Sequence, residues 1–187
     1  MNQLGQVLVV VSCVLTALTF ILAALGTAGR APGLIGRSVF AMRATAWVNI
    51  ALALLLARAF LLHDFSNCYV ASYSDSVMPL FYLVTAFWGG EKGALLFWVV
   101  TLSLLAMVVG RGRTHETDAR FGVLHATIAL ALLFFDILMV FASNPFEVFS
   151  PGMVPLEGNG LNPLLQNPLM AIHPPLQLAG FVAYTIP

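Results

Sequence analysis

The stretch VLVVVSCVLTALTFILAALG, residues 7–26, decides the class of this protein. It carries no charge and reaches the roughly 20 apolar residues that a helix needs to cross about 30 Å of hydrocarbon. The rest of the 187-residue chain is similar: 60% of its residues are hydrophobic, only 9% are charged, and the mean hydropathy is +0.93. Soluble domains carry about 25% charged residues, so the sequence indicates an integral membrane protein.

Three further segments have the length and apolar content of membrane spans, which predicts an all-α fold. Between the second and third spans, Pro79–Trp88 is apolar but short, and it ends at the glycine-rich turn Trp88–Gly93. We interpret it as an interfacial helix. The four complete spans are expected at about 7–26, 44–62, 94–109 and 121–142.

The stretch GLNPLLQNPLMAIHPP, residues 160–175, is rich in proline. Each proline lacks an N–H and disfavours the α conformation of the preceding residue. We therefore predict a Pro-rich outer loop over 143–175, with a fifth span starting at 176–187. Those last residues rise only about 18 Å as a helix, so we expect further chain, in cis or in trans, to complete the membrane region.

The basic residues predict the orientation. The loops expected at 63–78 and 143–175 contain no Lys or Arg. Positively charged loops stay in the cytoplasm, which places the N-terminus and the loops 63–93 and 143–175 outside. We expect Arg58 to extend outward and Lys92 to be balanced by Glu91. The arginines of the two cytoplasmic loops are Arg30, Arg37 and Arg43 after span one, and Arg111, Arg113 and Arg120 after span three.

Polar residues near or within the membrane are the candidates for function. His173 is the best candidate ligand for a metal or haem iron, because prolines restrict its backbone and its loop faces outside. Asp136 lies inside the fourth span, where a carboxylate must face protein or water; Arg58 and His125 are candidate partners. For the other histidines we expect roles without a ligand: interfacial capping for His63, solvent exposure for His115 and helix packing for His125.

The aromatic residues of the outer segments have two interpretations. They form either an interfacial aromatic belt or a hydrophobic wall for a flat ligand. The residues that would line such a wall are Trp88, Gly89, Gly90 and Trp98. Zero net charge argues against nucleic acid as a partner. The cysteines, Cys13 and Cys68, lie far apart in the sequence and form no metal or redox motif.

Several blocks of this sequence, in order, resemble the N-terminal part of the CcmF family of cytochrome c-type biogenesis proteins. A similar subunit of formate-dependent nitrite reductase assembly is a close relative of that family. The blocks are YVASYS at 69–74, WGGEKGALLFW at 88–98, SNPF at 143–146, LNPLLQNP at 161–168 and IHPP at 172–175. Leu83, and Lys92-Gly93-Ala94, depart from the family's usual residues.

The resemblance implies a component of the membrane haem lyase of cytochrome c maturation, in the bacterial inner membrane. It implies that His173 binds b-type haem transiently on the periplasmic face. The implied partners are a haem chaperone, apocytochrome c with its thiol-handling assembly proteins, and the C-terminal remainder of the lyase. The family's other haem-binding segments lie beyond Pro187, so we expect this chain alone to be incomplete as an enzyme.

Two alternatives remain open at this point. A subunit transporting haem or a small solute predicts paired broken helices and polar sites at the membrane midplane. A non-catalytic assembly scaffold predicts only surfaces for partner helices.

Overall fold

A computed structural model describes residues 1–29, 31–110 and 119–184 of this protein. Its four longest helices are α1 (Asn2–Ala28), α2 (Pro32–Leu61), α5 (Glu91–Val109) and α6 (Ala119–Phe141). Each is long and apolar enough to cross a membrane, which confirms the predicted all-α, four-span fold. The shorter helices are α3 (Cys68–Tyr73), α4 (Leu80–Ala86), η2 (Pro163–Leu165) and α7 (Pro168–Ala183).

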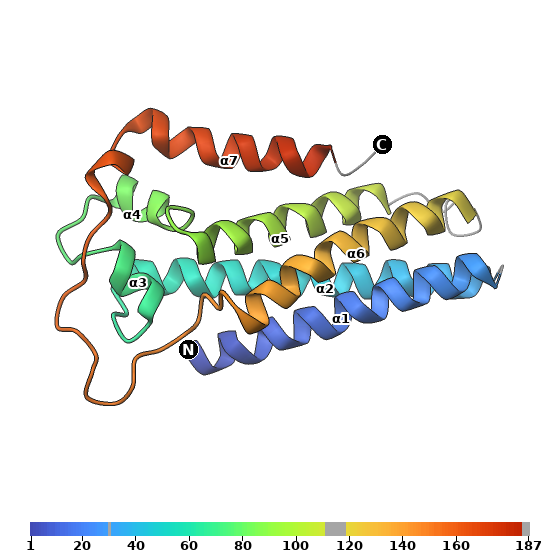
Figure 1. Ribbon diagram of the computed structural model, residues 1–187, viewed down its shortest axis with the longest axis horizontal. Helices are drawn as coiled ribbons and strands as arrows, with labels where there is room; N and C mark the ends of the chain where they lie inside the picture. The colour runs from blue at the N-terminus through green and yellow to red at the C-terminus, as the bar shows by residue number, and fades with distance from the viewer. Residues whose placement is uncertain (30, 111–118, 185–187) are drawn as a thin grey trace.

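The four long helices lie side by side, and α7 runs along α5 (Figure 1). The N-terminus, α3, α4 and the long segment after α6 gather at one end of the bundle (Figure 1). Asn2 fastens that end, because its amide nitrogen donates to Asp64 Oδ2 at 3.3 Å and to Ser66 Oγ at 3.1 Å. Its amide oxygen accepts from Asn67 Nδ2 at 3.1 Å. The segments expected outside the membrane therefore share one end, and we call it the loop end.

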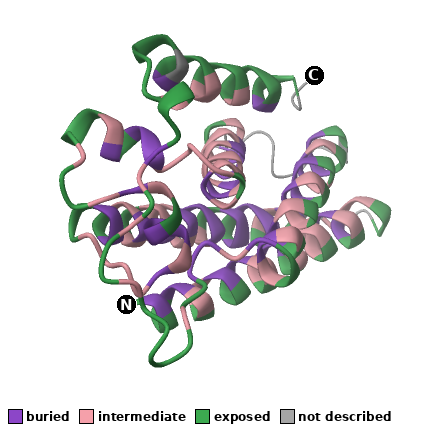
Figure 2. Cartoon of the chain, turned by 60° about the vertical axis from the view of Figure 1, so that its left-hand side comes forward, coloured by how far each residue is buried: buried purple, intermediate pink, exposed green. Residues whose placement is uncertain are grey.

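Small residues let α1 pack closely against α2 and α6. Its buried positions recur every three or four residues, which places them on one face of the helix. Such seams of small residues are typical of helix interfaces in membranes. In Figure 2 the buried surfaces face the bundle interior and the exposed ones face outward. The buried residues of α1 are Asn2, Gly5, Val9, Ser12, Thr16, Thr19, Ala23 and Gly26.

Helix α7 corrects the predicted loop over 143–175, because it begins at Pro168 and contains Pro174 and Pro175. Pro168 occupies the first turn, where an N–H has no helical partner anyway. Asn167 caps the helix by accepting from the amide of Leu169 at 2.9 Å. The two inner prolines leave the carbonyls of residues 170 and 171 without their helical donors. The helix continues past them, so His173 lies inside a helix.

The charges at the loop end pair differently from the prediction. Lys92 forms an ion pair with Glu147, not with Glu91. The Ser143 hydroxyl donates to Glu91, which begins α5 and lies near the positive end of its helix dipole. Arg58 is exposed and contacts the Met1 sulfur at the loop end.

Candidate functional site

Trp88 joins the α4 region to α7. Its indole Nε1 donates to the carbonyl of Ala171 at 3.1 Å. Because Pro175 has no N–H, this carbonyl lacks its usual helical donor. The indole therefore supplies the missing hydrogen bond, and it fixes α7 two residues before His173.

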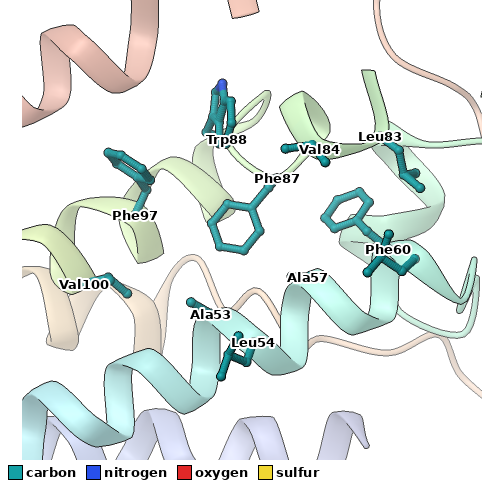
Figure 3. A pocket seen from close by; sticks show the side chains of 11 residues that line it. Ala53, Leu54, Ala57, Phe60, Leu83, Val84, Phe87, Trp88, Phe97 and Val100 are labelled. Carbon is teal, nitrogen blue, oxygen red and sulfur yellow. The ribbon is translucent and has the colours of Figure 1, made fainter. Parts of the chain in front are cut away.

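An apolar cavity of about 380 Å³ lies between α2, α4 and α5. Trp88 and Phe87 lie on one side of it, Ala53 and Leu54 of α2 lie across from them, and Phe60 lies beside Phe87 (Figure 3). The indole nitrogen of Trp88 is directed away from the cavity (Figure 3), consistent with its bond to α7. This cavity offers apolar surface only.

A second, wider groove of about 610 Å³ separates α4 from α7. Trp88 and Val84 line both the groove and the cavity, so the two share a wall. The residues of α7 that line the groove are Ala171, Ile172, Pro175 and Leu176. His173 lies between these positions in sequence but is not among the lining residues.

His173 is exposed on the outer face of α7. Within the described residues its imidazole makes no hydrogen bond. The same helical face carries three more exposed residues at helical spacing, while Ala171 and Val182 are buried on the opposite side. The imidazole therefore points away from this bundle. The exposed companions of His173 are Gln177, Gly180 and Tyr184.

Gly89 and Gly90 serve packing within the chain and line neither the cavity nor the groove. A Cβ on Gly90 would lie 2.3 Å from Tyr73 Cζ, so a larger residue would force the Tyr73 ring to move. Gly90 N donates to the Tyr69 hydroxyl at 3.1 Å, and this hydroxyl lies 3.1 Å from the Ala86 carbonyl oxygen. Burial raises the pKa of Tyr69, which keeps the hydroxyl protonated as a donor.

Trp98 belongs to a different aromatic cluster. Its ring stacks on Phe135 of α6 at 4.7 Å and on Phe181 of α7 at 6.2 Å between ring centroids. It therefore helps hold α7 against α5 and α6. The structure brings Trp88 and Trp98 into contact with α7, but neither cavity includes Trp98.

Two of the other histidines, His63 and His125, make contacts within the fold. His63 has a φ of +47° and stacks on Phe65, while Asp64 bonds Asn2 and Ser66 instead of orienting the imidazole. His125 is buried, with Nδ1 3.1 Å from Ser38 Oγ, which supports the expected packing role. His115 lies outside the described residues.

Asp136 is fully buried, as its position in a span required, but both predicted partners were wrong. Its Oδ1 accepts from Ser12 Oγ of α1 at 3.2 Å. Arg58 lies at the loop end with Met1, and His125 is bonded to Ser38. No charge pattern in the sequence identifies a serine in another span as the partner.

Comparisons with known proteins agree with the geometry. The sequence model of the family described as "Cytochrome C assembly protein" matches residues 88–187. The cytochrome c-type biogenesis protein CcmF of Escherichia coli (strain K12) is 38% identical over 71% of this chain and 20% of its own length. CycK of Rhizobium meliloti is 32% identical over 98% of this chain and 27% of its own length.

A solved structure described as "Cytochrome c Heme Lyase CcmF" has the same fold. It matches 99% of this chain with a TM-score of 0.82 at 23% sequence identity, and the match covers 28% of that structure. This chain therefore spans between a fifth and just over a quarter of the length of the proteins that it resembles.

Proposed function

The chain belongs to the cytochrome c assembly protein family, and we propose that it is the N-terminal membrane part of a cytochrome c haem lyase. In this proposal it presents haem on the outer face of the bacterial inner membrane for thioether attachment to apocytochrome c. The bound haem would supply an iron that takes imidazole ligands and vinyl groups that accept cysteine thiols.

The exposure of His173 carries this proposal. A free imidazole on the outward face of α7 suits a haem that is also held by other parts of the protein. Ile172 and Leu176, which flank His173 in the helix, line the groove toward α4, so apolar surface for a porphyrin ring lies beside the imidazole. The bond from Trp88 to Ala171 holds this part of α7 in place before haem arrives.

The chain's proposed role is to bind and orient. His173 would ligate b-type haem transiently, with Trp88 and Trp98 supporting the helix that carries it. The exposed face of α7 would meet the C-terminal remainder of the lyase. The haem chaperone, the apocytochrome and its thiol-handling partners would approach from the loop end, with the N-terminus outside. These assignments rest on the family and on the arginine distribution.

The transporter alternative gains no support from the helices. It predicts paired broken spans, whereas α1, α2, α5 and α6 each run without interruption over their described residues.

A complementation experiment tests the proposed function. A strain lacking its haem lyase receives the full-length protein that contains this region, either unchanged or with His173→Ala. We expect His173→Ala to abolish c-type cytochrome assembly at unchanged lyase abundance, because an exposed residue contributes little to folding. Gln177→Ala, one turn along the same face, is the matched control and should retain assembly. Normal maturation by His173→Ala would refute the proposed role of this residue.

A further inference from the structure

Four polar side chains from three helices meet inside the bundle. Ser12 and Thr16 come from α1, Asn49 from α2 and Asp136 from α6, and all four are fully buried with 0% exposure. Ser12 and Thr16 are one helical turn apart on the same face, and the Thr16 side chain lies beside Asp136. We call these four residues the polar cluster; the haem-handling proposal uses none of them.

The polar cluster has one hydrogen too few: Ser12 lies within hydrogen-bond distance of two acceptors but has one hydrogen to donate. Ser12 Oγ lies 2.7 Å from Asn49 Oδ1 and 3.2 Å from Asp136 Oδ1. Both neighbours are acceptors, and a serine hydroxyl has a single hydrogen to donate. Exchanging the amide atoms of Asn49 would supply a hydrogen to Ser12. That exchange would still leave the charge of an ionised Asp136 uncompensated.

The cluster also holds unsatisfied atoms. Asp136 Oδ2, Thr16 Oγ1 and Asn49 Nδ2 are buried and have no hydrogen-bond partner among the described residues. Buried polar groups of this kind are costly unless something pairs with them. Asp136 Oδ2 and Thr16 Oγ1 have lone pairs that can accept from or coordinate a small cation, whereas Asn49 Nδ2 is a donor and offers an oxygen there only if its amide atoms are exchanged.

No cationic side chain on the neighbouring helices is placed to neutralise Asp136. On α6, His125 is about 16 Å away along the helix and Arg120 about 24 Å. On α2, Arg58 is about 13 Å along the helix from Asn49, and it contacts Met1. The other titratable groups on the helices packed around Asp136 are Cys13 on α1, Arg37 and Arg43 toward the opposite end of α2, and Glu91 and Lys92 at the loop end of α5.

We propose that the polar cluster binds one small monovalent cation, a proton or a sodium ion, which neutralises Asp136 and ties α1 to α2 and α6. A proton on Asp136 completes the hydrogen-bond count: Asp136 donates to Ser12, and Ser12 donates to Asn49. A sodium ion would instead take the carboxylate, hydroxyl and amide oxygens, which are the ligands that hard cations prefer.

Thermal unfolding of this chain in lipid nanodiscs tests the proposal. A ligand that binds only the folded state stabilises it by mass action, so the unfolding temperature should fall when the cation is removed. The two arms are a pH series without sodium and a series at fixed pH with choline replacing sodium. In the arm of the true occupant, each tenfold rise in its concentration above the dissociation constant should raise the unfolding temperature by about 3–6 °C.

Matched variants test whether the cation dependence of the unfolding temperature comes from the polar cluster. Asp136→Asn keeps the shape without the charge and should abolish the cation dependence, whereas Glu157→Gln at the exposed loop end should retain it. Ser12→Ala removes one ligand and should shift the dependence to higher cation concentration, which covers the case in which Asp136→Asn does not fold. Infrared spectra distinguish the occupants, since only a proton gives a carboxylic acid band that Asp136→Asn removes. An ionised Asp136 with an unfolding temperature indifferent to both cations would overturn the proposal.

Discussion

At the scale of single residues, the bond from Trp88 to Ala171 explains a helix that local rules exclude. Proline removes a backbone donor wherever it occurs in a helix, and the prediction of a loop at 143–175 rested on that fact. The structure adds a side-chain donor from a segment more than 80 residues earlier in the chain. No local pattern in the sequence shows that this indole reaches that carbonyl.

The first prediction concerns this bond. Trp88→Phe should lower the free energy of unfolding by about 1–3 kcal/mol, because it leaves the Ala171 carbonyl without a donor. Equilibrium unfolding in detergent measures the change. Trp98→Phe is the matched control, since it removes the same ring atoms from a stacked tryptophan. An equal loss in both variants would mean that ring packing, not the hydrogen bond, stabilises this region.

The identity of a residue predicts its need for close packing or a partner, but not which residue meets that need. The glycines at 89 and 90 indicated a close backbone approach, and Gly90 is indeed in contact with Tyr73. The close neighbour is the protein's own tyrosine, which a turn motif does not specify. The position of Asp136 in a span predicts that it faces protein or water, but no pattern in the sequence identifies Ser12 as its partner.

At the scale of elements, apolar content was sufficient to predict the four spans. Lipid cannot satisfy backbone polar groups, so an apolar segment of sufficient length has to be a helix. The helices extend beyond the predicted bounds: α1 starts at Asn2 and α5 at Glu91. Polar residues at helix ends bond to the outer loops or cap the helix, as Asn2 does with Asp64. A hydropathy pattern does not record such contacts.

The second prediction concerns the coupling between α7 and α4. Pro175→Ala restores an N–H that can bond Ala171 within the helix, so Trp88 should matter less in this background. We expect the cost of Trp88→Phe to fall by at least half when Pro175→Ala is present. A double-mutant cycle of unfolding free energies measures this coupling. Strictly additive effects would show that the indole does not replace the missing helical donor.

At the scale of the whole molecule, the loops that lack basic residues lie together at one end of the bundle (Figure 1). The alternation of arginine-rich and arginine-free loops predicts that this end faces outside. The segment 111–118, which carries two of the arginines, lies outside the described residues. The order of α1, α2, α5 and α6 along the chain places these loops at alternate ends of the bundle, as the prediction requires. Cysteine labelling tests which end faces outside.

The third prediction is that Val77 lies on the outer side. In a chain with Cys13 and Cys68 replaced by alanine, Val77→Cys should react with a membrane-impermeant maleimide added to intact spheroplasts. Val77 is 88% exposed, so a cysteine at this position is accessible to the reagent. Gly33→Cys lies near the start of α2, at the end of the bundle opposite the loop end, and should react only after the membrane is opened. Labelling of position 33 from outside would reverse the orientation.

The central claim is that His173 ligates haem, and the haem spectrum of the purified full-length protein tests it most directly. We expect the outer-face haem of the wild type to show imidazole ligation. His173→Ala should lose this haem or convert it to a species that added imidazole restores, while Gln177→Ala keeps the wild-type spectrum. Unchanged haem content and an unchanged ligation spectrum in His173→Ala would contradict the account.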